Sequence, residues 1–180
     1  MIRQGRREDI EALLNIYNDE IEYGTATFDL EKKGIEEWTA WYEEHSGIYT
    51  LLVWEESGTA VGYATLSPYR EKEAYLGTVE LSVYVHRGYQ GRGIGTALMQ
   101  EMLNTARRTP EIHTVVSVIT GSNEGSLRLH ERLGFTYCGR VREAGFKFGR
   151  YLDIDTYQII VSDARGTKRK SNIRKLDVFS

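Results

Sequence analysis

The spacing of apolar residues changes several times along the chain, and each spacing predicts one kind of element. Where apolar residues recur every three or four positions, the period is that of a helix with one buried face. This spacing ends before Gly24 and Gly47, which are natural helix stops. The aromatic stripe Trp38, Trp41 and Tyr42 is more typical of a core than of a ligand site. The pattern predicts helices over residues 7–22, from 35 to about 46, 94–108 and 123–133.

Between these helices, short runs rich in β-branched and aromatic residues predict strands. The runs at 49–55 and 60–67 are joined by a turn rich in serine and glycine, as in a hairpin. The strand at 78–85, the following helix and the strand at 114–119 form a β–α–β unit, whose strands should be parallel neighbours. Other predicted strands are 2–4, 135–141 and 151–161. This order predicts an α/β (α+β) fold, with helices on both faces of a mixed sheet of about six to seven strands.

A glycine-dense turn, residues 90–96, connects the strand at 78–85 to the helix at 94–108. Glycine permits positive φ and lets a ligand approach the main chain. The free N–H groups at the start of a helix, together with the positive end of its dipole, favour a phosphate or pyrophosphate. The turn therefore predicts a phosphate site, although an ordinary strand–turn–helix connection would have the same pattern.

Composition and charge narrow the class of protein. A chain of 180 residues, 41% apolar and 27% charged, is typical of one soluble domain. We expect this domain at 1–162 and a basic tail at 163–180, which is more typical of a solvated terminus than of a binding segment. The formal charge of −3 argues against broad nucleic-acid binding, and no apolar run is long enough to cross a membrane. The single cysteine, Cys138, excludes an internal disulfide; with no apolar leader, it predicts a cytoplasmic protein.

Two motifs resemble those of the GNAT N-acetyltransferases. Gln-x-x-Gly-x-Gly at residues 90–95 is similar to that family's pyrophosphate loop, and it is neither the dinucleotide-binding G-x-G-x-x-G nor a Walker A loop. Residues 123–135 resemble the family's Asn-x-x-Ala-x-x-Leu-Tyr-x-x-x-Gly-Phe, with Ser126 for alanine and His130 for tyrosine. The two motifs occur in the family's order and are separated by one predicted strand.

Other segments narrow the resemblance to one branch. Thr25-Ala26-Thr27-Phe28 and residues 145–150 are similar to the phosphinothricin and methionine-sulfoximine acetyltransferases, and the similarity covers roughly residues 2–161. The resemblance implies the GNAT fold with a splayed pair of parallel strands. It also implies acetyl-CoA as the donor, a small amino acid or analogue as the acceptor, and a homodimer.

Glu80 lies in the strand that precedes the glycine-dense turn. The attacking amine needs a base, because an amine with a pKa near 8 or above is largely protonated at pH 7. Strand alternation puts Glu80, Ser82 and Tyr84 on one face, and partial burial in a cleft would raise the pKa of the Glu80 carboxyl. We predict that Glu80 is a general base that acts through water; the alternative is an exposed or ion-paired strand residue.

The resemblance also implies contacts with acetyl-CoA. Main-chain N–H groups at 83–85 would stabilise the oxyanion and pair with the pantetheine arm. Asn123 would contact the same arm; its alternative role is a helix N-cap, and both can be true. Arg92 would meet a CoA phosphate or stay solvated. The predicted cofactor-binding residues are Val83, Tyr84, Val85, Gln90, Gly91, Arg92, Gly93, Ile94, Gly95, Thr96 and Asn123.

His130 takes the place of a tyrosine that protonates the leaving CoA thiolate in many relatives. Histidine donates a proton near neutral pH more readily than tyrosine does. We predict that His130 is the general acid; a hydrogen-bonded packing residue is the alternative.

Three residues match positions that line the acceptor pocket in the resembling branch: Phe28, Arg70 and Tyr75. Arg70 would pair with a substrate carboxylate. For Phe28, the alternative is a packing role in the core. The branch often has Arg-x-Arg-Pro-Ala-Tyr-Arg here, whereas this chain has Lys72 and Leu76 in place of the second and third arginines. The difference favours an acceptor that is more neutral or apolar than phosphinothricin.

The sequence therefore predicts an acetyl-CoA-dependent N-acetyltransferase that acts on a small amine without a metal. One alternative is an acetyltransferase for peptide or protein N-termini, whose partner contacts the basic tail. Another is a CoA-binding sensor without catalysis.

Overall fold

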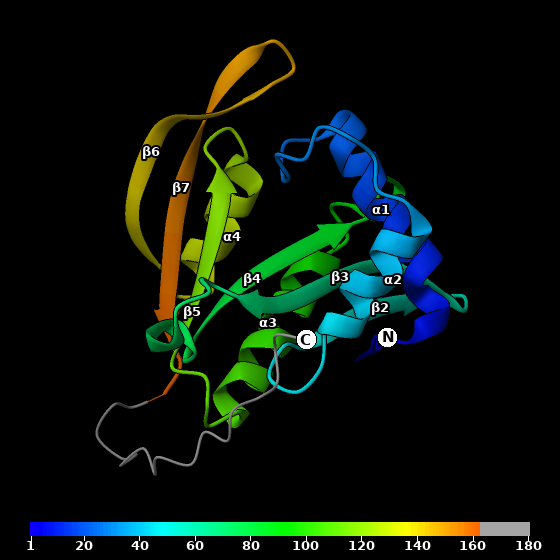
Figure 1. Ribbon diagram of the computed structural model, residues 1–180, viewed down its shortest axis with the longest axis horizontal. Coiled ribbons are helices and arrows are strands. Elements are labelled where there is room, and N and C mark those ends of the chain that lie inside the picture. Colours follow the sequence, from blue (N-terminus) through cyan, green and yellow to red (C-terminus); the bar gives the residue numbers. More distant parts are fainter. Residues whose placement is uncertain (163–180) are drawn as a thin grey trace.

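Within residues 1–162, the part that the computed structural model describes, seven strands form one mixed sheet in the order β1-β2-β3-β4-β5-β7-β6 (Figure 1). The predicted element order and mixed sheet are confirmed, and the predicted tail at 163–180 lies outside the described residues. The strands are β1 (Ile2–Gln4), β2 (Leu51–Glu56), β3 (Thr59–Pro68), β4 (Thr78–Val85), β5 (Thr114–Thr120), β6 (Thr136–Lys147) and β7 (Arg150–Ile160). The helices are α1 (Ile10–Tyr23), α2 (Ile35–Glu44), α3 (Ile94–Arg108) and α4 (Glu124–Arg132), with 3₁₀ turns at Arg7–Asp9, Glu73–Tyr75 and Arg87–Tyr89.

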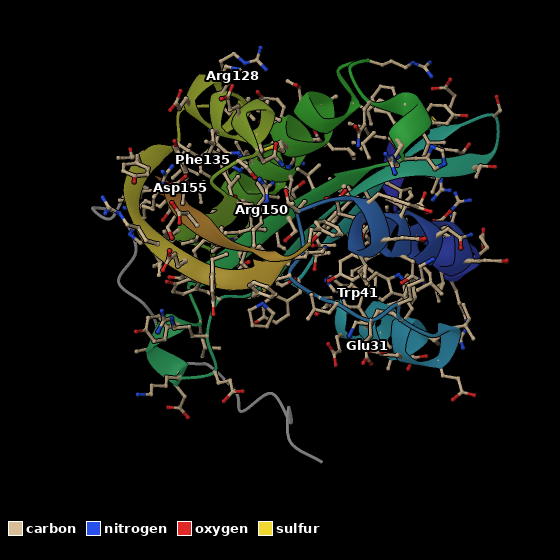
Figure 2. The ribbon with its side chains drawn as sticks, turned by 90° about the horizontal axis from the view of Figure 1, so that it is seen from above. Glu31, Trp41, Arg128, Phe135, Arg150 and Asp155 are labelled. Atoms are coloured by element: carbon tan, nitrogen blue, oxygen red, sulfur yellow. The ribbon has the colours of Figure 1, made fainter. Side chains whose placement is uncertain are left out.

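Helices cover both faces of the sheet, as predicted. The apolar side chains of α1 and α2 share a core with Leu51, Val53 and Tyr63 on one face. On the other face, α3 and α4 lie over a core that includes Val79 and Leu81. Figure 2 shows α3 and α4 above the sheet and α1 and α2 below it. The sheet therefore separates two layers, and a ligand that reaches both of them must pass between strands.

Such a passage requires strands that separate, and β4 and β5 do so. They are the only parallel pair in the described sheet, and their ladder covers three positions, the last of which joins Glu80 to Val116. Beyond it, β4 continues along β3 to Val85, and β5 continues along β7 to Thr120. Ser117 Oγ donates to Leu81 O at 3.2 Å across the first open position. The predicted splay is confirmed, and the later part of β4 has no partner strand on its β5 side.

The C-terminal hairpin is longer than we predicted. The strand expected to end at Val141 runs to Lys147, and its turn is Phe148-Gly149, with φ of 53° and 73°. Two register shifts interrupt the ladder between β6 and β7, and Glu143 takes a φ of 51°. Bulges of this kind break the two-residue alternation from which strands are predicted, so the sequence pattern does not predict the second half of β6.

Candidate active site

The glycine-dense turn enters α3 with its main chain uncovered. Gly91 and Gly93 have φ of 74° and 80°, a region that L side chains rarely adopt. A Cβ atom at either position would meet no heavy atom within 4 Å, so the space beside the turn is open. The first helical hydrogen bond runs from Ala97 N–H to Gly93 O, which leaves the N–H groups of residues 94–96 without an acceptor in the helix. The turn therefore has the free donors that an anion site needs.

Two side chains of the turn are held by the protein itself. Gln90 Nε2 donates to Val85 O at 3.2 Å and ties the turn to the end of β4. Arg92 Nη2 lies 2.8 Å from Glu56 Oε1, and its guanidinium lies over the ring of Tyr89. An exposed ion pair such as this one is weak, so a phosphate can compete with Glu56 for Arg92.

Glu80 is half-buried at the point where β4 and β5 separate. Burial, without a contribution from a nearby charge, raises the pKa of its carboxyl. The predicted alternation is confirmed, because Val79 and Leu81 join the core beneath α3 while Tyr84 packs against Tyr17 on the other face. A carboxylate whose pKa is raised is a stronger base than a solvated one.

The start of α4 contains Asn123, whose Oδ1 accepts a hydrogen bond from Ser126 N–H at 3.1 Å. Asn123 is therefore an N-cap. The predicted contact of Asn123 with the pantetheine arm is compatible with this role and stays a prediction.

His130 is buried on α4, and its two ring nitrogens differ. Nδ1 lies 2.8 Å from Ser126 O, and because a carbonyl only accepts, Nδ1 carries the proton. Nε2 is buried without a hydrogen-bond partner in the described residues. Burial lowers the pKa of the ring, which is therefore neutral at pH 7. Its free nitrogen is a proton acceptor in this state.

The three predicted substrate residues do not lie together in one chain. Phe28, on the α1–α2 connection, packs so closely on Gly145 of β6 that a Cβ atom there would lie 2.4 Å from its ring. Arg70 lies over the rings of Tyr69 and Tyr75 in the β3–β4 connection. Figures 1 and 2 both draw the two connections on different sides of the molecule. One chain therefore does not form a single pocket from Phe28, Arg70 and Tyr75.

Sequence reasoning missed Lys147, which is buried at the tip of the β6–β7 hairpin. Its Nζ donates to Thr27 O at 2.9 Å and to Glu20 O at 3.3 Å. Tyr17 OH lies 2.8 Å from both Thr27 Oγ1 and Asp29 Oδ2. The bonds of Lys147 fasten α1 and the α1–α2 connection to the hairpin tip, and those of Tyr17 hold the connection to α1. A lysine in a short turn is usually exposed, so the sequence contained no signal for this role beyond the family similarity at 145–150.

A cavity of about 300 Å³ lies between the helices α1 and α2 and the sheet. None of the three predicted substrate residues lines it. Its lining residues are Tyr17, Asp29, Lys33, Glu37, Trp38, Trp41, Tyr63, Thr65, Ser67, Ser82 and Tyr84.

Two further observations concern residues 1–162 alone. No helix there combines the length and the apolar character that a membrane span requires. No group of His, Cys, Asp and Glu side chains in the same part of the chain is arranged to hold a metal ion.

The known proteins named here, which are similar to this chain in sequence or in fold, are acetyltransferases. A family model described as the acetyltransferase (GNAT) family matches residues 10–135. Phosphinothricin N-acetyltransferase of Streptomyces coelicolor is 42% identical over 161 residues, which cover 87% of this chain and 94% of that protein. The L-methionine sulfoximine/L-methionine sulfone acetyltransferase of Salmonella typhimurium is 36% identical, covering 88% of this chain and 92% of that one. A phosphinothricin acetyltransferase from Sinorhizobium meliloti, solved with acetyl-CoA, superposes with a TM-score of 0.91 at 29% identity over 97% of this chain and 95% of that chain.

Proposed function

Since the chain belongs to the GNAT acetyltransferase family and is an acetyl-CoA-dependent N-acetyltransferase, we propose that its acceptor is the primary amine of a small amino acid or amino-acid analogue. The observation that carries this proposal is the position of Glu80, a half-buried carboxylate where the sheet opens between β4 and β5. The similar enzymes named above, which act on phosphinothricin and methionine sulfoximine, support the acceptor class.

The donor would bind across the open part of the sheet. The free N–H groups of residues 94–96 and the uncovered main chain at Gly91 and Gly93 would hold the pyrophosphate. The unpaired side of residues 83–85 would hydrogen-bond the pantetheine amides, as an added strand does. This arrangement would place the thioester beside Glu80.

The reaction would be a direct transfer. Glu80 takes a proton from the acceptor ammonium through water, and the free amine attacks the thioester carbon. A main-chain N–H on the unpaired side of β4, that of Val83 or Val85, stabilises the oxyanion that forms. The thioester C–S bond then breaks, the nitrogen gives up its second proton to water to become the amide, and the thiolate takes up a proton.

His130 would supply that proton from Nε2. Because Nδ1–H is donated to Ser126 O, the ring must first be protonated at Nε2. Burial lowers the pKa of the ring, so this acid is scarce at pH 7 but strong when formed.

The separation of Phe28 from Arg70 and Tyr75 supports a homodimer. If one acceptor contacts both connections, as the resembling branch implies, one of them comes from a second chain. The edge strand β6 and its neighbour β7 also expose Tyr137, Val141, Phe146 and Tyr151, which would be covered by a second copy. Mixing a Phe28→Ala chain with an Arg70→Ala chain should then restore activity, because one of the two shared sites keeps both wild-type residues, whereas unshared sites predict no recovery.

The proposed function is tested by measuring free CoA thiol with a panel of acceptors. We expect release with neutral amino acids or sulfones, and a loss of about 10²–10⁴-fold in turnover for Glu80→Gln. Removal of residues 163–180 should leave this activity unchanged, whereas an enzyme for protein N-termini that binds its partner through the tail should lose it. Acetyl-CoA binding without thiol release from any amine would identify a sensor instead.

A further inference from the structure

The cavity between α1, α2 and the sheet follows three rows of paired residues on β3 and β4. Tyr63 pairs with Tyr84, Thr65 with Ser82, and Ser67 with Glu80. Directly paired residues of antiparallel strands project from the same face. The short side chains of the middle row leave space where larger ones would fill the interface between helices and sheet. The cavity thus runs from two tyrosine rings toward Ser67, the partner of the proposed base.

Aromatic rings form most of the wall. Trp38 and Trp41 of α2 stack with ring centroids 4.4 Å apart, and Tyr17 of α1 lies 4.5 Å from Trp38. On the sheet side, the rings of Tyr63 and Tyr84 lie 5.2 Å apart. Figure 2 labels Trp41 between the two helices of this layer. Walls of this kind favour a flat apolar group, because rings pack well against rings in stacked or edge-on geometry.

Two buried donors in the same wall have no partner. The side chains of Trp38 and Tyr63 are 4% and 1% exposed, and neither Trp38 Nε1 nor Tyr63 OH has a hydrogen-bond partner in the described residues. Both side chains line the cavity, and buried polar groups in native proteins are normally paired, so these two donors could be satisfied by a ligand group that accepts hydrogen bonds.

The charged side of the cavity is already paired. Lys33 Nζ lies 3.0 Å from Glu37 and 3.5 Å from Asp29, and Asp29 also accepts from Tyr17 OH. Two carboxylates against one ammonium leave an excess negative charge, which disfavours an anionic ligand group.

We propose that this cavity holds the side chain of the acceptor, and that this side chain is an uncharged aromatic ring bearing an oxygen that accepts from Tyr63 OH or Trp38 Nε1–H. The amine end of the acceptor then lies toward the Ser67–Glu80 row. The proposal rests on the proposed N-acetyltransferase function, and it adds the substrate class that the site selects.

The kinetic test compares L-tyrosine with L-phenylalanine, which lacks the ring oxygen, using L-methionine sulfone and phosphinothricin as non-aromatic acceptors. We expect kcat/KM to be about fivefold to tenfold higher for L-tyrosine than for L-phenylalanine. At least one of Tyr63→Phe and Trp38→Phe, the one that removes the donor to the ring oxygen, should reduce that preference toward unity. Tyr23→Phe, an exposed tyrosine outside the cavity, should preserve it. A preference that persists in both cavity variants, or aromatic acceptors that are inert while methionine sulfone reacts, would overturn the proposal and leave the proposed function intact.

A second measurement separates binding from turnover. Two of the three tryptophans line the cavity, so L-tyrosine added without acetyl-CoA should change the tryptophan fluorescence. The change should be smaller in Tyr63→Phe at the same ligand concentration. If no amine releases CoA thiol but the fluorescence still responds, the proposed function fails and the cavity proposal stands. If the fluorescence does not respond to L-tyrosine, the cavity proposal is wrong.

Discussion

Replacing Gly145 by alanine should force apart the hairpin tip and the α1–α2 connection. A Cβ atom at this position would lie 2.4 Å and 2.5 Å from two ring carbons of Phe28, and 3.2 Å from a third. Ordinary contacts between carbon atoms are about 3.5–4.0 Å, so the overlap is about 1 Å. The main chain beside Phe28 cannot easily move away from Gly145, because Thr27 O accepts a hydrogen bond from Lys147 and the Thr27 hydroxyl is hydrogen-bonded to Tyr17.

The overlap sets the expected magnitude. Overpacking of this size costs about 1–3 kcal/mol in the free energy of unfolding. When Phe28 is also replaced by alanine, the obstructing ring is gone, and Gly145→Ala should cost no more than about 0.5 kcal/mol. The two substitutions should therefore couple by about 0.5–3 kcal/mol. Since Phe28 is a predicted acceptor residue, Gly145→Ala should also raise KM for the acceptor and leave KM for acetyl-CoA unchanged.

The assay is urea unfolding of the wild type, both single variants and the double variant at pH 7. Gly125→Ala is a matched control, because its added Cβ would meet its nearest atom at an ordinary 3.8 Å and alanine favours helix. It should be neutral or slightly stabilising. Equal costs for Gly145→Ala with and without the Phe28 ring would refute the reasoning, since the ring would then not be the obstacle.

Three further outcomes are expected. Burial raises the pKa of Glu80, so its ionised form destabilises the folded chain at pH 7; Glu80→Gln should raise the urea midpoint there, and the gain should disappear below pH 4.5, where the carboxyl is protonated in both states. An unchanged midpoint at pH 7 would contradict this. Gly93→Ala should cost about 1 kcal/mol of stability through its positive φ and raise KM for acetyl-CoA severalfold, while the acceptor KM stays constant in initial-rate kinetics. His130→Phe should lower kcat by about tenfold or more, and His130→Tyr, which restores the residue of many relatives, should retain more activity; equal losses would remove His130 from proton transfer.

The parts of the site that could be predicted from sequence are those with strong local patterns. Alternation along residues 78–85 placed Glu80 and Tyr84 on one face, and the structure agrees. The glycines at 91 and 93 indicated positive φ, and both have it. These features depend on a few neighbouring residues, so a single sequence is enough.

Other features depend on contacts between distant segments. Nothing in the neighbourhood of Lys147 indicates that its ammonium bonds to carbonyls of Glu20 and Thr27. Likewise, the helical stripe containing Trp38 predicts core, and Trp38 is buried, but only the short residues on β3 and β4 leave a cavity beside it. The separation of Phe28 from Arg70 is set by the paths of two connections that no local pattern specifies.

The three-position ladder between β4 and β5 also divides the sheet into two antiparallel parts. β1–β4 and β5–β7 each form a ladder of antiparallel strands, and within the sheet the seam between them consists of that short parallel ladder and the Ser117–Leu81 bond. Outside the sheet, the core beneath α3 and the bonds of Lys147 to Thr27 and Glu20 also join the two parts. A chain severed in the connection after α3 would leave each fragment with its own pairing intact, so the fold is a natural candidate for reassembly from two pieces. Activity would then report directly on whether the seam has closed.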